Sequence, residues 1–225
     1  MKAMILAAGR GERMRPLTDK LPKPLLPVAG KPLIVHHIER LAVAGYCELV
    51  INHAHMGKMI EARLGKGSTW GVDIQYSPEE VALETGGGIY RALPLLGDEP
   101  FLVVNGDVWC EIDFSNLHLS HGDLAHLVLV PNPSHHQQGD FQLQQGRVKQ
   151  GNDDLLTFSG VGIYHPHLFE SCAPVVFPLG PLLRDAMDKG FVSGVSFTGL
   201  WMDVGTPQRL MLLERIIQHN LSANG

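Results

Sequence analysis

At residues 3–13 the chain reads Ala3-Met4-Ile5-Leu6-Ala7-Ala8-Gly9-Arg10-Gly11-Glu12-Arg13, a short apolar run followed at once by a basic loop that contains glycine. A buried strand that leads into such a loop can hold the phosphate chain of a nucleotide. Glycine lets backbone N–H groups approach phosphate oxygens, and arginine supplies positive charge. The loop matches neither of two commoner phosphate-binding patterns, because G-x-x-x-x-G-K-[ST] does not occur and Met14 interrupts G-x-G-x-x-G.

The composition is that of an ordinary soluble protein, with 44% hydrophobic residues, 18% charged residues and a mean hydropathy of +0.04. A chain of 225 residues can bury a core of its own, so we expect a single domain over residues 1–225. The net charge of -5, without any basic stripe, argues against a nucleic-acid-binding protein. Local basic residues in an acidic chain instead indicate a small anionic substrate.

The cysteines and the hydropathy pattern favour a cytoplasmic protein. Cys47, Cys110 and Cys172 are odd in number and form no C-x-x-C motif, so we expect reduced and mostly buried thiols. The N-terminal apolar run is too short for a signal peptide, and no run approaches the length of a membrane span. The 12 histidines lack the spacing of a catalytic zinc motif, so we expect no zinc site.

Apolar runs alternate with amphipathic stretches, which predicts an α/β fold with a largely parallel sheet. We expect strands at 4–6, 48–52, 73–76, 101–105, 124–130, 158–164 and 192–197, and a hairpin over 140–148 around Gly146. We expect helices at 32–44, 56–64, 89–95, 181–189 and 208–221, with 201–207 as a turn before the last one. The apolar residues of that last helix, Met211 and Leu212 among them, are expected to pack in the core.

The run Phe101–Asn105 is of the fully buried, central-strand kind, and it ends in Gly106-Asp107. Ligands of open α/β sheets bind beyond the carboxyl ends of the strands, which puts Asp107 where a site is expected. A Gly-Asp pair after a strand is also common in plain turns, so Asp107 alone is weak support for a function.

Two stretches together resemble the signature of the sugar-1-phosphate nucleotidyltransferases. They are Leu6-Ala7-Ala8-Gly9-x-Gly11-x-Arg13 and the later Pro22-Lys23-Pro24. The resemblance implies a Rossmann-like (GT-A-like) three-layer sandwich with a mixed, mostly parallel central sheet, formed by one catalytic domain. It also implies a reaction in which a sugar 1-phosphate oxygen attacks the α-phosphorus of a nucleoside triphosphate and releases pyrophosphate.

A reaction of this kind needs no general base, because its nucleophile is already an anion. Catalysis then depends on bringing two polyanions together and stabilising their charge, which calls for Mg²⁺, oxygen ligands and cationic side chains. Asp107 is the first expected metal ligand. Asp203 is the second, because Trp201-x-Asp203-Val204-Gly205-Thr206-Pro207 resembles the family's second metal motif. The alternative is that Asp203 only caps the last helix, a role better suited to Thr206.

The resemblance places an arginine along the leaving pyrophosphate and a lysine on the transferred phosphate, and these match Arg13 and Lys23. Arginine suits bidentate phosphate contacts, whereas lysine acts as a point charge. The alternative is that both are solvated loop charges. The expected catalytic residues are Arg13, Lys23 and Asp107, and the expected nucleotide contacts are Ala8, Gly9, Gly11, Glu12, Arg13, Lys23, Ala82, Thr85 and Gly86.

The segment Ala82-Leu83-Glu84-Thr85-Gly86-Gly87-Gly88 corresponds to the base-reading region of the family, whose usual form is close to Leu-Gly-Thr-Ala-Gly. Here Glu84 replaces a glycine, and the glutamine that often reads a pyrimidine is absent. Main-chain groups around Ala82 and Thr85 are therefore expected to read the base. A purely structural helix start after Gly88 is the alternative.

Expected sugar contacts are Asn105, Gly139, Asp140 and Gly160. Asn105 precedes Asp107, and Gly139-Asp140 falls where relatives carry a turn that contacts a sugar hydroxyl, although a plain surface turn is equally compatible. Gly160 takes the place of an asparagine of relatives and leaves room for a bulky substituent. The family's Glu-Lys-Pro segment is missing, so its second phosphate-binding lysine has only Lys149 as a weak substitute.

Within the family, the short length and the glycine-rich segment most resemble uridylyltransferases of N-acetylmuramate α-1-phosphate, enzymes of peptidoglycan recycling. We therefore expect UTP and a sugar 1-phosphate as substrates and Mg²⁺ as cofactor, without nucleic-acid or membrane partners. Alternatives are a mannose-1-phosphate guanylyltransferase, a glucose-1-phosphate thymidylyl- or uridylyltransferase, and, in another class, a non-catalytic sugar-nucleotide-binding regulatory module. No stretch indicates an oligomer interface.

Overall fold

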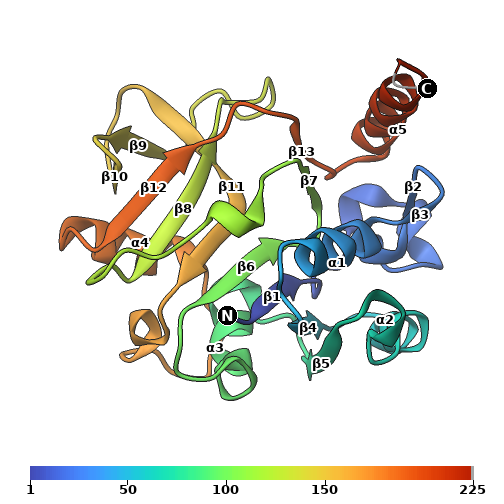
Figure 1. Ribbon diagram of the computed structural model, residues 1–225, viewed down its shortest axis with the longest axis horizontal. Coiled ribbons are helices and arrows are strands. Elements are labelled where there is room, and N and C mark those ends of the chain that lie inside the picture. Colours follow the sequence, from blue (N-terminus) through green and yellow to red (C-terminus); the bar gives the residue numbers. More distant parts are fainter. Residues whose placement is uncertain (224–225) are drawn as a thin grey trace.

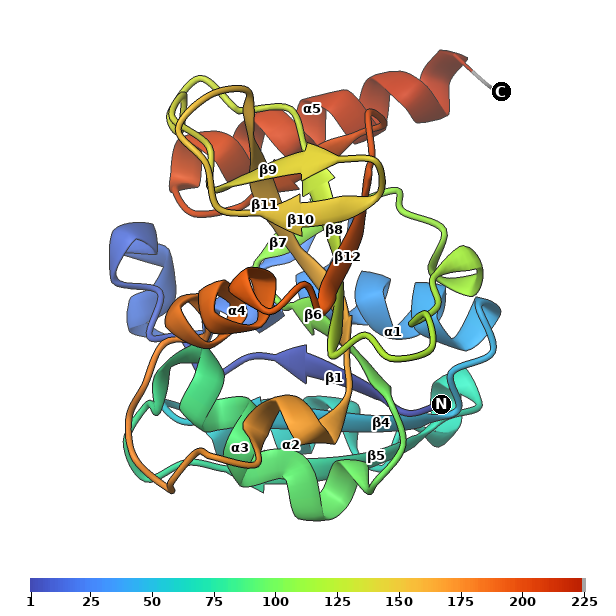
Figure 2. The ribbon, with the colours of Figure 1, turned by 90° about the vertical axis from the view of Figure 1, so that its left-hand side faces the viewer.

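A mixed sheet of nine strands runs through the molecule, with helices on both faces (Figures 1 and 2). The structure is a computed structural model that describes residues 1–223. The strands are β1 (Ala3–Leu6), β2 (Pro27–Val28), β3 (Lys31–Pro32), β4 (Glu48–His53), β5 (Asp73–Pro78), β6 (Phe101–Asn105), β7 (Val108–Cys110), β8 (Ala125–Val130), β9 (Phe141–Gln144), β10 (Arg147–Lys149), β11 (Leu155–Tyr164), β12 (Val192–Ser196) and β13 (Trp201–Asp203). The α-helices are α1 (Leu33–Val43), α2 (Gly57–Leu64), α3 (Glu84–Leu96), α4 (Leu179–Asp188) and α5 (Pro207–Ala223).

The strand order of the large sheet is β5-β4-β1-β6-β11-β8-β12-β10-β9. β5, β4, β1 and β6 are parallel neighbours, so their carboxyl ends meet at one edge. β11 runs antiparallel to both β6 and β8, and β12 runs parallel to β8. The predicted α/β fold with a mixed sheet is confirmed, and the parallel pairing is concentrated in the first half of the chain.

The alternating direction of side chains along β1 explains why the sheet lies between two layers of helices. Successive side chains of a strand point to opposite faces, and here Ile5 and Met4 are both fully buried but belong to different clusters. Ile5 packs in the cluster that includes Ile38 of α1, whereas Met4 packs in the cluster that includes Ile89 of α3 and Leu183 of α4. A central strand buried on both faces therefore needs the unbroken apolar run that the sequence contains.

The glycine-rich start of α3 differs from the expectation. The sequence predicts a helix over 89–95, but the helix begins at Glu84 and includes all three glycines. A Cβ on Gly86 would lie 2.4 Å from the Phe177 ring, and a Cβ on Gly88 would lie 2.8 Å from Asn52 Nδ2. The glycines therefore serve close packing of the first helical turns, which outweighs their low helix propensity.

The segment predicted as a turn over 201–207 contains a short strand instead. β13 pairs antiparallel with β7, so that Asp203 lies opposite Val108, and the Val204 N–H donates to the Asp107 carbonyl oxygen at 2.7 Å. Thr206 caps α5, because its Oγ1 accepts from the Arg209 N–H at 3.3 Å. The ladder between β7 and β13 brings two distant carboxylates to one place.

Three further expectations are tested by pairing and burial. The hairpin of β9 and β10 is confirmed, and its two turn residues, Gln145 and Gly146, have φ of 51° and 75°, as a tight hairpin turn requires. Core packing of Met211 and Leu212 is wrong, because they are 52% and 49% exposed. Among the side chains of α5 that the structure describes, Leu210 and Leu213 are the buried apolar ones. The expectation of mostly buried thiols is also wrong: Cys110 is buried, Cys172 is half-buried and Cys47 is exposed.

Among the described residues, no helix combines the length and the hydrophobicity that crossing a bilayer would need.

Candidate functional site

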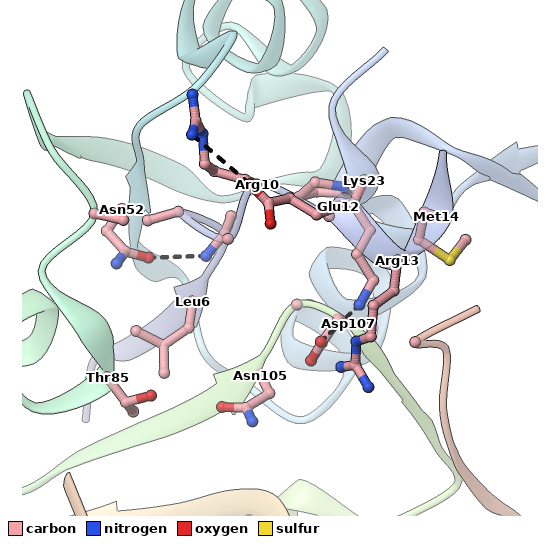
Figure 3. Close-up of a pocket in the computed structure, with 18 of the residues that line it drawn as sticks. Leu6, Arg10, Glu12, Arg13, Met14, Lys23, Asn52, Thr85, Asn105 and Asp107 are labelled. Atoms are coloured by element: carbon pink, nitrogen blue, oxygen red, sulfur yellow. Dashed lines mark hydrogen bonds and ion pairs between the residues drawn. The ribbon is translucent and has the colours of Figure 1, made fainter. Parts of the chain in front are cut away.

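A cavity of about 470 Å³, here called the first cavity, lies at the carboxyl edge of the parallel strands. It is lined by Leu6, Ala7, Ala8, Gly9, Arg10, Gly11, Glu12, Arg13, Met14, Lys23, Pro24, Asn52, Ala82, Glu84, Thr85, Asn105, Gly106, Asp107 and Gly205. Figure 3 shows Lys23, Arg13 and Asp107 together on one side of this cavity, and Asn52 and Thr85 on the other. A polyanion would find Lys23 and Arg13 on the first side, and Arg10 adds a further positive charge to the cavity lining.

The loop after β1 holds its shape through two anchors. Gly11 has φ of 65°, and a Cβ there would lie 3.0 Å from Thr18 Cγ2 and 3.1 Å from Lys23 Cβ, so a side chain would be both strained and crowded. The Thr18 hydroxyl donates to the Gly11 carbonyl oxygen at 2.8 Å. Met14 is fully buried and packs in a cluster with Leu213 of α5. The methionine that breaks the glycine pattern is thus the hydrophobic anchor of the loop.

Most of the predicted nucleotide contacts come together here. Ala8, Gly9, Gly11, Glu12, Arg13, Lys23, Ala82 and Thr85 all line the first cavity. Gly86 does not line it: this glycine is buried against Phe177, and its predicted nucleotide contact stays a prediction. Glu84 lines the cavity with φ of 60°, the left-handed conformation that glycine adopts without strain. The backbone here keeps a glycine-type conformation although the side chain is Glu.

Lys23 and Asp107 form the central ion pair. Lys23 Nζ lies 2.7 Å from Asp107 Oδ2, and the lysine side chain is 9% exposed, whereas the aspartate side chain is 43% exposed. A buried ammonium needs such a partner, because its desolvation is costly. The more exposed carboxylate remains open to the cavity and to any cation that enters it.

A second cavity of about 380 Å³ adjoins the first. It is lined by Arg13, Asn105, Asp107, Val108, Pro133, His135, His136, Thr157, Phe158, Ser159, Gly160, Trp201 and Asp203. Arg13, Asn105 and Asp107 line both cavities. Two molecules bound side by side would therefore meet at these three residues.

Asp203 opens onto the second cavity from β13 and is held by two cationic or polar partners. Arg209 Nη1 donates to Asp203 Oδ1 at 2.8 Å, and His135 Nε2 lies 2.9 Å from the same oxygen. Neither His135 nor Arg209 is among the site residues predicted from the sequence. The only signal for Arg209 is its place in the first turn of α5, and no local pattern links His135 to Asp203.

The expected metal pair is compatible with this geometry. Asp107 and Asp203 both line the second cavity, and within residues 1–223 no group of three or more His, Cys, Asp and Glu side chains could hold a metal ion. A closed site of protein ligands is therefore not built within these residues. Two carboxylates that leave the remaining positions to water and phosphate oxygens are the kind of donor set that Mg²⁺ accepts.

The predicted sugar contacts divide into two groups. Gly160 has φ of 79° and lies beside Asn105, and both line the second cavity. Gly139 and Asp140 do not line it. The Asp140 carboxylate accepts from the Phe158 N–H at 2.8 Å and lies 3.2 Å from His136 Nε2, so it supports two lining residues from behind.

A Cβ on Gly139 would lie 2.8 Å from Leu155 Cβ, so this glycine allows a close approach of two chain segments. Lys149 lies exposed on β10 and does not line either cavity. Neither cavity is lined by Gly139, Asp140 or Lys149, so the contacts predicted for these residues stay predictions.

His37 contacts the backbone next to Asp107 and does not line the cavities. Its side chain is buried, its Nε2 lies 2.8 Å from the Val108 carbonyl oxygen next to Asp107, and burial lowers its pKa to about 4. Burial raises the pKa of the Cys110 thiol to about 11. Both groups are neutral at pH 7, so they serve packing and not acid–base chemistry.

Comparison with known proteins gives one family match and several relatives. The model of the family described as "Nucleotidyl transferase" matches residues 2–151. An N-acetylmuramate alpha-1-phosphate uridylyltransferase from Neisseria meningitidis serogroup B is 57% identical over 220 residues, with 93% of this chain and 95% of that protein covered. A protein of the same name from Caulobacter vibrioides is 37% identical over 229 residues, with coverage of 94% and 95%.

A mannose-1-phosphate guanyltransferase beta-B from Xenopus laevis is 30% identical over 92% of this chain, which spans 62% of that protein. Among solved structures, a protein from Bacillus anthracis assigned as a glucose-1-phosphate thymidylyltransferase matches with a TM-score of 0.85 and 22% identity, over 96% of this chain and 94% of its own. HddC from Yersinia pseudotuberculosis matches with a TM-score of 0.77 and 21% identity, over 96% of this chain and 99% of its own. These two likenesses agree with the observed fold.

Proposed function

The chain belongs to the nucleotidyl transferase family, and from that premise we propose that it transfers a uridylyl group from UTP to N-acetylmuramate α-1-phosphate. The products would be the UDP-sugar and pyrophosphate. The enzyme class follows from the family and its relatives, whereas the base, the sugar and the metal are parts of the proposal. A role in peptidoglycan recycling is included in it, because N-acetylmuramate is a peptidoglycan sugar.

The observation that carries the proposal is the junction of the two cavities at Arg13, Asn105 and Asp107. We assign the triphosphate and base to the first cavity, and the sugar 1-phosphate to the second. One oxygen of the sugar phosphate would attack the α-phosphorus, and the bond from that phosphorus to the bridging oxygen of the pyrophosphate would break. Because the two cavities adjoin, both reactants can be held in the orientation that the reaction needs. Holding them so removes a large part of the activation free energy in such reactions.

The glycines and charged residues at the junction then have separate roles in binding the substrates and the metal. Gly9 and Gly11 would let the backbone lie against the triphosphate, Arg13 would contact the leaving pyrophosphate, and Lys23 would contact the transferred phosphate. Asp107 and Asp203 would hold Mg²⁺, which neutralises phosphate charge when it is bound. Their present partners, Lys23 for Asp107 and Arg209 for Asp203, are cations that would then be free to face phosphate oxygens.

The second cavity supports a bulky acceptor. At position 160 the chain has glycine, and a side chain there would occupy space beside Asn105. Trp201 lines the same cavity and is held by a hydrogen bond from its Nε1 to the Ser159 carbonyl oxygen at 2.9 Å. An aromatic ring in a fixed position can pack against the apolar face of a sugar.

The test is a panel that measures pyrophosphate release. UTP with N-acetylmuramate 1-phosphate should react faster than UTP with glucose 1-phosphate or mannose 1-phosphate, and UTP should be preferred over GTP, ATP and dTTP. Activity should disappear with a chelator and return with Mg²⁺. Equal rates with glucose 1-phosphate would refute the proposed sugar. A preference for GTP and mannose 1-phosphate would favour the guanylyltransferase alternative, which the 30% identity to the Xenopus protein supports.

A further inference from the structure

A buried polar pair lies on the side of the first cavity that faces away from Lys23 and Asp107. Asn52, at the end of β4, is 2% exposed, and Glu79, just after β5, is 5% exposed. The pair lies between two segments: the phosphate loop, residues 7–13, and the base loop, residues 82–85, which supplies Ala82, Glu84 and Thr85 to the cavity lining. Asn52 also lines the cavity itself (Figure 3).

Three hydrogen bonds run through the pair and join these two loops. The Ala7 N–H donates to Asn52 Oδ1 at 2.8 Å, the Asn52 Nδ2–H donates to Glu79 Oε1 at 2.7 Å, and the Leu83 N–H donates to Glu79 Oε2 at 2.9 Å. The asparagine thus accepts from one loop and donates toward the other. Both ends of the connection are backbone groups, so the connection sets backbone positions.

The carboxylate of Glu79 is held without a counter-ion. Within the part of the chain that the structure describes, no lysine, arginine or histidine forms an ion pair with it. A buried carboxylate is costly unless hydrogen bonds satisfy it, so an apolar residue would serve simple packing better. Gly88 of α3 packs directly on the pair, since a Cβ there would lie 2.8 Å from Asn52 Nδ2 and 2.9 Å from Glu79 Oε1.

Leu83 is the point at which the base loop is held. Its N–H is taken by Glu79, and its carbonyl oxygen accepts from the Phe177 N–H at 3.3 Å. With both main-chain groups hydrogen-bonded, the backbone at Leu83 is held in place. Its neighbours Ala82, Glu84 and Thr85 line the cavity.

We propose that Asn52 and Glu79 are positioning residues for the nucleotide, because they hold the base loop at a set distance and orientation from the phosphate loop. This inference rests on the proposed function only in that a nucleoside triphosphate occupies the first cavity. A nucleotide contacts both loops at once, so a change in their relative position would weaken its binding. The acceptor in the second cavity would be affected much less.

The donor and acceptor pattern of the pair provides a sharp test. Asn52→Asp places a carboxylate against Glu79, and Glu79→Gln places a donor against either the Asn52 Nδ2 group or the Leu83 N–H. Each single variant therefore breaks the connection. In the double variant, the new carboxylate at position 52 would accept from both the Ala7 N–H and the new amide, and the amide oxygen would accept from the Leu83 N–H. All three hydrogen bonds are then restored, and in the central one position 79 is the donor and position 52 is the acceptor.

Each single variant should raise the KM for UTP by about tenfold or more, and the KM for the sugar 1-phosphate should change by less than about threefold. The double variant should return the KM for UTP to within about threefold of the wild type. Glu80→Gln is the matched control, because Glu80 is the exposed neighbour of Glu79 and should leave all constants unchanged.

The proposal is overturned if the single variants lose thermal stability but keep the KM for UTP, or if the double variant binds UTP no better than the weaker single variant. Should Asn52→Asp fail to fold, Glu79→Gln against Glu80→Gln decides, and an unchanged KM for UTP overturns the proposal. The wild-type panel tests the proposed function separately. If another nucleoside triphosphate is preferred there, the same variants are measured with that nucleotide.

Discussion

Replacing Gly160 by alanine should obstruct the second cavity while leaving the first one open. Gly160 has φ of 79°, and a Cβ there would lie 2.6 Å from Asn105 Nδ2 and 2.9 Å from Asn105 Cβ. The second of these contacts is with the base of the side chain, which cannot move aside by a rotation about χ1. Asn105 and the backbone of β11 must therefore shift apart.

The cost has two parts, and the chain offers a variant that separates them. A left-handed backbone costs a non-glycine residue about 1–2 kcal/mol. Gly146, in the hairpin turn between β9 and β10, has φ of 75°, and a Cβ added there would meet nothing within 4 Å, so Gly146→Ala has the backbone strain alone. In a domain of this size, about 1 kcal/mol lowers Tm by about 2–4 °C. Gly146→Ala should therefore lower Tm by about 2–8 °C, and Gly160→Ala should lower it further.

Only Gly160→Ala should change acceptor binding. Loss of the Asn105 position removes a polar contact at the junction and narrows the cavity, and we expect the KM for the sugar 1-phosphate to rise by about tenfold or more. The KM for UTP should rise less, because most residues that line the first cavity are untouched. Gly146→Ala should leave both constants unchanged.

The assay combines initial rates of pyrophosphate release, with each substrate varied in turn, and thermal unfolding of the same preparations. If Gly160→Ala raises the KM for the sugar 1-phosphate no more than Gly146→Ala does, the acceptor does not pass close to Gly160 and the assignment of the second cavity is wrong. If the KM for UTP rises by the larger factor, the two cavities have been assigned in the wrong order.

Asp107→Ala and Asp203→Ala should each lower the rate of pyrophosphate release by at least about a hundredfold with the fold retained in circular dichroism, since each removes a proposed ligand of the Mg²⁺ that would neutralise phosphate charge. Near-wild-type rates in either variant would refute the metal pair. Lys23→Met should cause a loss of similar size in kcat, whereas the exposed Lys149→Met should have no effect, and equal losses would show that bulk charge matters and not position. Burial lowers the pKa of His37 to about 4, so the unfolded state binds a proton between about pH 6.5 and 4 that the folded state does not. The free energy of unfolding should therefore fall by up to about 3 kcal/mol as the pH is lowered across that window in metal-free buffer, with a smaller fall in His37→Gln; parallel pH profiles from urea titrations of the two proteins would contradict this.

Local sequence signals are sufficient for most of the scaffold. The central strand Phe101–Asn105 is predicted with the bounds that the structure has, because a strand buried on both faces requires an unbroken apolar run. The loop after β1 is predicted from contiguous residues, and Lys23 is predicted because Pro22-Lys23-Pro24 resembles part of the family signature. Each of these features depends on neighbours in the chain.

The start of α3 shows where such signals fail. Three consecutive glycines predict a turn, because glycine disfavours a helix. The helix forms there because Phe177 and Asn52 approach its backbone too closely for side chains, and both come from distant segments. The same holds for Met211 and Leu212, whose hydrophobicity predicts burial but whose side of α5 is left exposed by the described residues.

The sequence by itself determined the class of fold, the loop after the first strand and the identity of the charged residues, since alternation and short motifs are properties of adjacent positions. Only the tertiary structure decided which of those residues meet. The ladder of β7 and β13 brings Asp203 beside Asp107, α5 and a loop bring Arg209 and His135 to Asp203, and Asn52 reaches Glu79 across two parallel strands. These contacts depend on strand order and register. Both are set by the packing of the whole core, and neither produces a local pattern in the sequence.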